Sequence, residues 1–265
     1  MLDFLNDELP NNENDFMAIA SNISLGDRAN QEDSFDYYIQ DDFGIIALCD
    51  GMGGLNAGEV ASSSSVKNVI EICKKHFKEM EITNLLKFST LSSNNIVKNL
   101  FDDSGEKINA GCTLVSVFIN NKELFWNSVG DSRIYLFRDN KLVQITQDHN
   151  YKTVIDEKLS CGMIDKNEYD TEISKGEALI SYLGIDGEPL IDYNNIPFEI
   201  TSGDRILMIS DGLYKILSDN EISTVLSNFF NINDAVNALE SKAKTIADNV
   251  GKIRDNTTII LILIK

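Results

Sequence analysis

Histidine, proline and tryptophan are scarce in this 265-residue sequence, which contains two, three and one of them respectively. The four cysteines form no Cys-x-x-Cys pair, and no histidine stands near them at metal-ligand spacing, so neither a zinc site nor a disulfide framework is indicated. We expect reduced cysteines in a cytoplasmic protein. The longest apolar run, residues 259–264, is far too short to span a bilayer.

Basic residues are also in deficit: 23 lysines and arginines face 42 aspartates and glutamates, which gives a net charge of −19. This charge repels the phosphates of nucleic acids and anionic lipids, so we expect no nucleic-acid partner and no membrane insertion. The same charge would repel any other phosphorylated molecule unless bound cations and a local arginine reversed the field where it binds.

The first residues differ in character from the rest of the chain. Residues 1–15 are acidic and rich in asparagine, and they contain Pro10, which indicates a flexible tail. They carry neither a basic segment nor a sustained apolar stretch, so no conventional signal peptide is expected. We expect residues 16–265 to form a single domain and the protein to be a monomer.

Hydrophobic patterning in this domain indicates an α+β fold. Apolar or alternating runs predict strands at 17–24, 33–40, 44–50, 112–119, 123–131, 133–137, 142–146, 204–212 and 256–264. Helices are predicted within 57–80, 83–100 and 220–249. The strands at 112–146 follow one another through short turns, predicted as hairpins at Asn120-Asn121 and Arg138-Asp139-Asn140, which favours antiparallel sheets. Two such sheets with helices on both outer faces would bury all the apolar faces, as a four-layer α-β-β-α sandwich.

Six short motifs, most of them acidic, carry the functional signal. They are RANQED (28–33), CDGMGG (49–54), GCT (111–113), VGDSR (129–133), SDG (210–212) and RDNTT (254–258). Four of the six begin or end a strongly apolar run, which predicts that their carboxylates stand at strand ends on a rigid sheet. A single Asp-Gly after a strand is more commonly a turn. Carboxylates gathered at one place, however, require a cation.

In this order, the motifs resemble those of the metal-dependent protein serine/threonine phosphatases of type 2C, the PPM family, and of its bacterial branch in particular. The resemblance runs from about Ala18 to Ile264. It implies the same four-layer fold, with a flap segment at about 148–193. It also implies hydrolysis of phosphoserine and phosphothreonine in proteins by a water that bridges two divalent metal ions. The partners would be phosphorylated substrates of a bacterial serine/threonine kinase.

The resemblance assigns metal ligands residue by residue. Asp50 would bridge both ions, and the carbonyl of Gly51 would add a further oxygen. Glu32 would complete the ligands of one ion, and Asp211 and Asp255 those of the other. These oxygen donors suit Mn²⁺ or Mg²⁺.

Three further residues take supporting roles in the same pattern. Asp33 would hold metal-bound waters from the second layer of ligands. Arg28 would grip the phosphate oxygens with its planar guanidinium, and with Asp33 and Asp50 it forms the expected catalytic set. Asp131 matches a ligand of an additional, more loosely held metal ion. Thr113 is expected to support the site from beneath, and Asn256 to orient Asp255.

Two departures from the pattern bear on activity. Relatives place a histidine where this chain has Leu55 or Met52, and neither residue can donate a proton. The histidine in the QDHN segment, His149, is expected to have a structural role. Lys215 stands where relatives carry an acid that faces the third metal, so we expect two ions held firmly and the third weakly. These departures keep open an alternative, a catalytically weak regulatory or binding module with the same fold.

Overall fold

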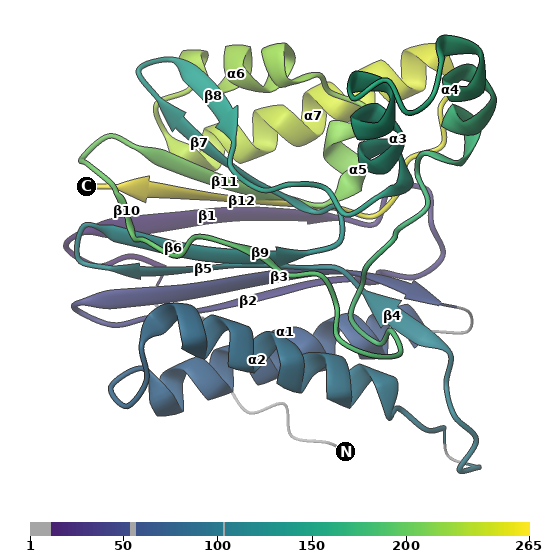
Figure 1. The fold of residues 1–265 in the computed structure, drawn as a ribbon. Helices are drawn as coiled ribbons and strands as arrows, with labels where there is room; N and C mark the ends of the chain where they lie inside the picture. Colours follow the sequence, from purple (N-terminus) through teal and green to yellow (C-terminus); the bar gives the residue numbers. More distant parts are fainter. Residues whose placement is uncertain (1–11, 54–56, 103) are drawn as a thin grey trace, which may run out of the picture.

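The structure, a computed structural model, describes residues 12–53, 57–102 and 104–265. Two sheets stack on each other, and helices cover the outer face of each, so the described part of the chain forms four layers, α-β-β-α (Figure 1). All strand pairs within the two sheets are antiparallel. The four-layer sandwich predicted from the sequence is therefore confirmed.

The first sheet contains five strands. In spatial order they are β1 (Met17–Ser24), β12 (Thr257–Ile264), β11 (Arg205–Ile209), β7 (Arg133–Arg138) and β8 (Lys141–Gln144). Its outer face is covered by α5 (Asp211–Tyr214), α6 (Asp219–Asn228) and α7 (Ile232–Val250). The β7–β8 turn consists of Asp139 and Asn140, both with positive φ, as the sequence predicted.

The second sheet has its long strands at the centre. Its order is β10 (Phe198–Glu199), β6 (Glu123–Val129), β5 (Leu114–Asn120), β3 (Phe43–Gly53) and β2 (Asp33–Ile39). Two short strands extend it: β4 (Ala110–Cys112) pairs with the end of β3, and β9 (Asp192–Tyr193) pairs with β6. Helices α1 (Ala57–His76) and α2 (Ile82–Lys98) cover its outer face.

Burial on both faces explains why the central strands are continuous apolar runs instead of alternating ones. In β3, Ile45 and Ala47 face α1 and α2, whereas Ile46 and Leu48 face the other sheet. Strand β12 follows the same rule, with alternate residues directed to the helices and to the space between the sheets. A run that is buried on both faces places a following carboxylate at a fixed point.

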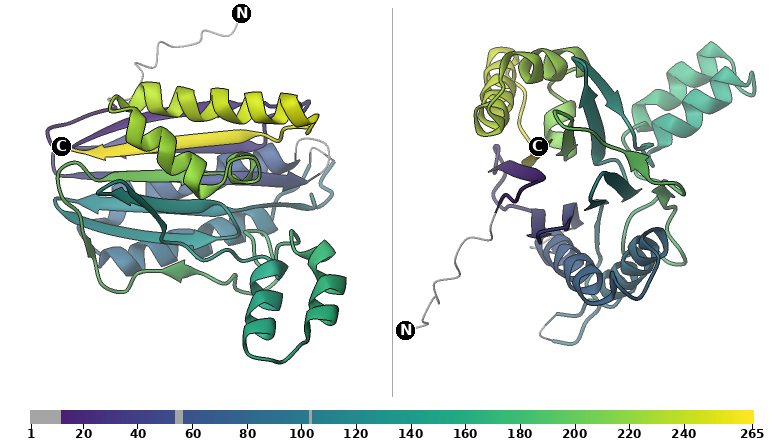
Figure 2. Two further views of the ribbon diagram at one scale, coloured as in Figure 1. Left: turned by 90° about the horizontal axis from the view of Figure 1, so that it is seen from above. Right: turned by 90° about the vertical axis from the view of Figure 1, so that its left-hand side faces the viewer.

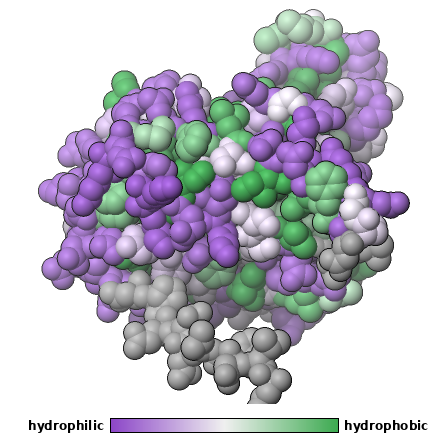
Figure 3. Space-filling view, turned by 90° about the horizontal axis from the view of Figure 1, so that it is seen from below, coloured by the Kyte–Doolittle hydropathy of each residue, from purple (hydrophilic) through white to green (hydrophobic). Residues whose placement is uncertain are grey.

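Helix α1 docks closely because its sheet-facing side begins with small residues. Ala57, Gly58, Ala61, Ser62 and Ser65 are all buried there. A Cβ on Gly58 would lie 2.9 Å from the carbonyl carbon of Gly51, so only glycine permits this approach. On the solvent side of α1 and α2, polar residues predominate and apolar ones are scattered (Figure 3). The two helices therefore meet the second sheet through one apolar side.

The segment expected as a flap, residues 148–193, contains a helical hairpin. It consists of α3 (Tyr151–Ser160) and α4 (Lys166–Glu172), followed by a 3₁₀ turn, η1 (Ile173–Lys175). The hairpin projects from the body of the molecule (Figure 2). Its return path is anchored, because Leu183 and Cys112 exchange two backbone hydrogen bonds, of 2.8 and 3.1 Å. Leu183 therefore has a fixed position beside β4.

Most of the expected tail, residues 1–11, lies outside the described residues. Its last part is attached to the domain: the Asn12 carbonyl accepts from the Ile19 N–H at 2.8 Å, and Lys265 pairs with Glu13 at 2.9 Å. Contacts with the domain are thus present from Asn12 onward. Among the described residues, no helix combines the length and apolarity needed to cross a membrane.

Candidate active site

The acidic motifs meet at one end of the sandwich, where several strands begin or end. Asp50 lies near the end of β3, and Asp33, the first residue of β2, is its partner in the sheet register. Asp211 is the first residue of α5, two residues after the end of β11, and Asp255 stands two residues before β12. Asp131 lies in the turn between β6 and β7. The fold therefore brings together motifs that are far apart in the sequence.

Apart from Asp33, these residues line a cavity of about 590 Å³. Of the candidate site residues, the lining includes Arg28, Glu32, Asp50, Gly51, Asp131, Asp211 and Asp255. Asp33 does not line the cavity, because it is buried behind Asp50. Gly51 has to be glycine, since a Cβ there would overlap the carbonyl oxygens of Gly58 and Glu32. The backbone segments of Gly51, Gly58 and Glu32 thus pack closely together and form the floor of the cavity.

Asp50 is held through its backbone. Its N–H donates to the Thr113 hydroxyl at 3.0 Å, its carbonyl accepts from the Thr113 N–H at 2.8 Å, and the same hydroxyl contacts that of Ser132 at 2.7 Å. Thr113 therefore supports the site from beneath, as expected. Burial, followed by the negative charges of Asp33 and Asp211, raises the pKa of Asp50 well above its usual range. Its carboxylate needs a positive partner to remain ionised.

Asp33 is fixed on one side and open on the other. One of its oxygens, Oδ2, accepts from the hydroxyls of Ser210 and Thr258, each at 2.8 Å. The other, Oδ1, is buried and has no hydrogen-bond partner among the described residues. Burial raises the pKa of Asp33 to about 7, although the two hydroxyls oppose this shift. A buried acceptor that lacks a protein donor is suited to a bound cation or water.

The loop that carries Arg28 and Glu32 is fixed by Asn256. The Asn256 side chain accepts from the Glu32 N–H at 2.8 Å and donates to the carbonyls of Leu25 and Asn30 at 2.9 and 3.0 Å. Its side chain therefore positions this loop and not the carboxylate of Asp255, contrary to the role expected from the sequence. Only its backbone N–H donates to Asp255, at 2.9 Å.

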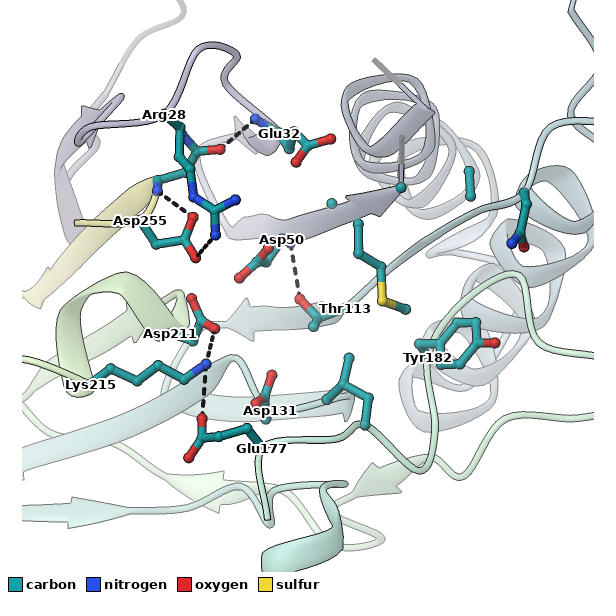
Figure 4. Close-up of a pocket in the computed structure, with 17 residues that line it drawn as sticks. Arg28, Glu32, Asp50, Thr113, Asp131, Glu177, Tyr182, Asp211, Lys215 and Asp255 are labelled. Atoms are coloured by element: carbon teal, nitrogen blue, oxygen red, sulfur yellow. Dashed lines mark hydrogen bonds and ion pairs between the residues drawn. The ribbon is translucent and has the colours of Figure 1, made fainter. Parts of the chain in front are cut away.

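Two cations neutralise part of the carboxylate cluster (Figure 4). Arg28 pairs with Asp255 at 2.6 Å, which raises the pKa of the guanidinium further. Lys215 bridges Asp211 at 2.6 Å and Glu177 at 2.9 Å. Burial lowers the pKa of Lys215, but these two carboxylates raise it more. Lys215 therefore faces the site carboxylates, and the weak third metal site expected from it stays a prediction.

Asp131 lies near this ammonium, in the same cavity. Burial and the charge of Asp211 raise its pKa to about 6, and Lys215 offsets part of this effect. For Glu32, burial raises the pKa, and Arg28 opposes it. Across the cluster, the ionised carboxylates thus carry more negative charge than the two cations can neutralise.

The donor set fits hard divalent cations, although not in the observed side-chain positions. Within 12–53, 57–102 and 104–265, no three carboxylate, histidine or cysteine side chains stand close enough together to enclose one metal ion. The reason is visible in the ion pairs, because Asp255 is turned to Arg28 and Asp211 to Lys215. The donors are all oxygens, and Asp33 Oδ1 lacks a partner among the described residues. Binding would exchange these internal cations for metal ions.

Several residues at the site were not among those predicted from the sequence. Glu177 belongs to the irregular segment after η1, and no pattern marked it as a partner of Lys215. Ser210 and Thr258 stand inside the SDG and RDNTT motifs, close to the expected ligands. Their position there is a signal from which hydroxyl donors to the site could have been predicted. Leu55, one of the two positions at which the resemblance led us to expect a histidine, lies outside the described residues.

Arg133 and His149 have structural roles. Arg133 makes a two-point ion pair with Asp148, at 3.0 and 2.7 Å, and does not line the cavity. The imidazole Nδ1 of His149 accepts a hydrogen bond from the Gly130 N–H at 3.2 Å, and the backbone N–H of His149 donates to the Gly130 carbonyl at 2.9 Å. These contacts hold the turn that carries Asp131. The structural role expected for His149 is therefore confirmed.

His149→Gln is expected to lower the free energy of unfolding by about 1–3 kcal/mol near pH 7.5, because a buried hydrogen bond is lost. Burial lowers the pKa of His149 in the folded state, so its contribution is present above the unfolded pKa and is lost as pH falls through the folded pKa. The difference between wild type and variant should narrow from pH 7.5 to pH 5 in urea unfolding curves. His76→Gln, which removes the other histidine, is the matched control. A constant difference would contradict a buried neutral imidazole.

Comparisons with known proteins agree with this geometry. The family model described as protein phosphatase 2C matches residues 17–157, just over half of the chain. A serine/threonine phosphatase, stp, of Listeria welshimeri is 29% identical over 222 residues, which cover 82% of this chain and 83% of that protein. The crystal structure of the serine/threonine phosphatase PstP from Mycobacterium tuberculosis superimposes with a TM-score of 0.76 at 26% identity, over 94% of this chain and 99% of that one.

A second solved structure bears on the cofactor. The catalytic domain of serine/threonine protein phosphatase PstP in complex with two manganese ions has a TM-score of 0.67 at 26% identity. It covers 94% of this chain and 98% of that one. A protein with this fold therefore binds two manganese ions.

Proposed function

Because the chain belongs to the protein phosphatase 2C family, we propose that it hydrolyses phosphoserine and phosphothreonine esters in proteins. One observation carries the proposal: an arginine and six carboxylates line a single cavity at the strand ends of the sandwich. An isolated carboxylate cluster would repel a phosphate dianion, whereas a cluster loaded with cations attracts it. The arrangement thus suits a metal-dependent phosphomonoesterase.

We propose that Asp50, Glu32, the Gly51 carbonyl, Asp211 and Asp255 hold two Mn²⁺ or Mg²⁺ ions. When bound there, the ions would neutralise the phosphoryl oxygens and make the water between them acidic enough to attack phosphorus. The role of Asp33 follows from its two fixed hydroxyl contacts and its open oxygen, which can accept a proton or a hydrogen bond from water. Thr113 and Asn256 keep Asp50 and the Arg28 loop in place.

Arg28 is the group that would hold the substrate phosphate. Its side chain is about half exposed, at 53%, and stands at the cavity beside Asp255. The guanidinium carries five N–H donors in a planar fork, so contact with Asp255 leaves donors that can bind phosphoryl oxygens. Fixed donors of this kind orient the ester in line with an attacking water.

Arg28→Ala is expected to raise KM for a phosphopeptide and the inhibition constant of inorganic phosphate about tenfold, because a charge-assisted contact worth about 1.5 kcal/mol is lost. Arg28→Lys keeps the charge without the planar fork and should fall between wild type and alanine. Steady-state kinetics with phosphate as inhibitor measure both constants. Unchanged inhibition by phosphate in Arg28→Ala would rule out this role.

We further propose a cytoplasmic monomer that reverses the action of a bacterial serine/threonine kinase. Every residue assigned to the site comes from one chain, so a single copy is sufficient. The charge of −19 disfavours nucleic acid as a partner. The kinase assignment rests on the bacterial relatives and on the proposed reaction.

The test is phosphate release from phosphoserine and phosphothreonine peptides with Mn²⁺, and again after exhaustive chelation. Release that requires Mn²⁺ or Mg²⁺ supports the proposal. Release that survives chelation would exclude the two-metal mechanism. No release at any metal concentration, with metal binding intact, would favour the alternative of a binding module.

A further inference from the structure

The cavity has two unlike walls. Arg28 and the carboxylates occupy one end, and Tyr182 lies at the other end, with its hydroxyl directed away from the carboxylates (Figure 4). Met52 and Leu179 line the cavity as well, and both are partly buried. A surface that combines thioether, aliphatic and aromatic groups attracts apolar groups and offers little to an anion.

The apolar wall is built on fixed backbone. Met52 and Gly111 are register partners in β3 and β4, and Leu183 is hydrogen-bonded to Cys112 on the other edge of β4. A Cβ on Gly111 would lie 2.7 Å from Met52 Cε and 2.8 Å from Tyr182 Cδ2, so the two side chains close over this glycine. Near Leu179, the Ile180 N–H donates to the His149 carbonyl at 2.9 Å. A preorganised wall loses little entropy when it binds a ligand.

The size of the cavity determines what can reach this wall. At about 590 Å³ it is in the range of sites that hold a drug-sized ligand, so it has room for a phosphorylated side chain and a neighbouring residue. Consecutive Cα atoms of a peptide are about 3.8 Å apart, so a residue next to one that is held at Arg28 extends along the same cavity. An acidic neighbour would meet Glu32, Asp131 and Glu177.

We propose that Met52, Leu179 and Tyr182 form a subsite that binds an apolar side chain next to the phosphorylated residue of the substrate. This inference rests on the proposed function, because it takes phosphopeptides as the ligands. Partial burial of a leucine side chain contributes about 1.4 kcal/mol, which corresponds to about tenfold in affinity. The preference should therefore appear in KM.

The experiment compares phosphothreonine peptides that carry leucine, asparagine or aspartate at one neighbouring position. In wild type, kcat/KM should be about tenfold higher for the leucine peptide than for the asparagine peptide, and lower still for the aspartate peptide. In Tyr182→Ala or Leu179→Ala the leucine-to-asparagine ratio should fall toward one, whereas Tyr182→Phe should retain it. Met163→Ala, an exposed methionine of the helical hairpin, is the matched control.

The outcomes separate the subsite from the reaction. A ratio near one in wild type, or a ratio that both alanine variants retain, would overturn the subsite even if all peptides are hydrolysed. If no peptide is hydrolysed, the proposed function fails, and the subsite is then tested by fluorescence anisotropy with the same labelled peptides. Equal binding of the leucine and asparagine peptides would overturn it there. Melting temperatures identify any variant that fails to fold. If one of the two alanine variants does not fold, the leucine-to-asparagine ratio of the other alanine variant tests the subsite.

Discussion

Asp50→Asn is expected to lower kcat for phosphopeptides by at least about a thousandfold. Asp50 stands at the floor of the cavity and is the carboxylate assigned to both metal ions. An amide cannot supply the negative charge that holds two cations, and the loss of several kcal/mol of transition-state charge stabilisation corresponds to this factor. The backbone contacts to Thr113 do not involve the side chain, so the position of residue 50 should persist.

The same substitution should leave the metal-free protein as stable as wild type or more stable. Burial and the neighbouring carboxylates raise the pKa of Asp50, so above the unfolded pKa its ionised form opposes folding. Asparagine removes that cost at neutral pH. Thermal unfolding in the presence of chelator measures the stability of the two metal-free proteins, and calorimetric titration with Mn²⁺ measures the lost metal affinity.

Asp186→Asn is the matched control. Asp186 pairs with Lys98 on the surface, so its substitution removes the same charge at a position away from the cavity. It should change neither kcat nor metal affinity. If Asp50→Asn kept kcat within tenfold of wild type, or unfolded the protein, the role of Asp50 as a metal ligand would be wrong.

Local patterns were sufficient to predict the sheets and the acidic end of the molecule. In β3 and β12, an apolar run that is buried on both faces can only be a central strand, and the adjacent motif then stands at its end. Asp50 and Asp255 could therefore be placed from the sequence. The turn after β5 is formed by Asn121 and Lys122, one residue later than the predicted Asn120-Asn121, because the register pairs Asn120 with Glu123.

Contacts between distant, irregular segments could not be predicted in this way. Glu177 and Tyr182 follow η1 in a stretch without periodic pattern, and their positions depend on backbone bonds to β4 and His149. The sequence alone also does not show which basic side chain will pair with a carboxylate from a distant segment. The contact of Asp255 with Arg28 depends on tertiary geometry, whereas Asp211 pairs with Lys215 four residues later, one helical turn along α5.

Lys215→Asp is expected to strengthen binding of a third divalent cation by ten- to a hundredfold. Asp131 and Asp211 would supply ligands for that ion, but the Lys215 ammonium already pairs with Asp211 and with Glu177. A third ion must therefore displace or approach a like charge, which costs about 1 to 3 kcal/mol after allowance for solvent screening. Aspartate would replace this repulsion with an additional oxygen ligand. Wild type should hold two ions firmly and the third only at high metal concentration.

Titration of Mn²⁺ followed by electron paramagnetic resonance counts bound ions independently of activity. Lys215→Met removes the charge without adding a ligand, so its third site should lie between wild type and Lys215→Asp. Lys175→Asp makes the same change in net charge on the surface, where Lys175 pairs with Glu172, and should have little effect because solvent and salt screen a distant charge. If Lys175→Asp matched Lys215→Asp, the effect would be long-range electrostatics. If wild type bound three ions with equal affinity, Lys215 would not oppose the third ion, and its role would be limited to joining Glu177 to Asp211.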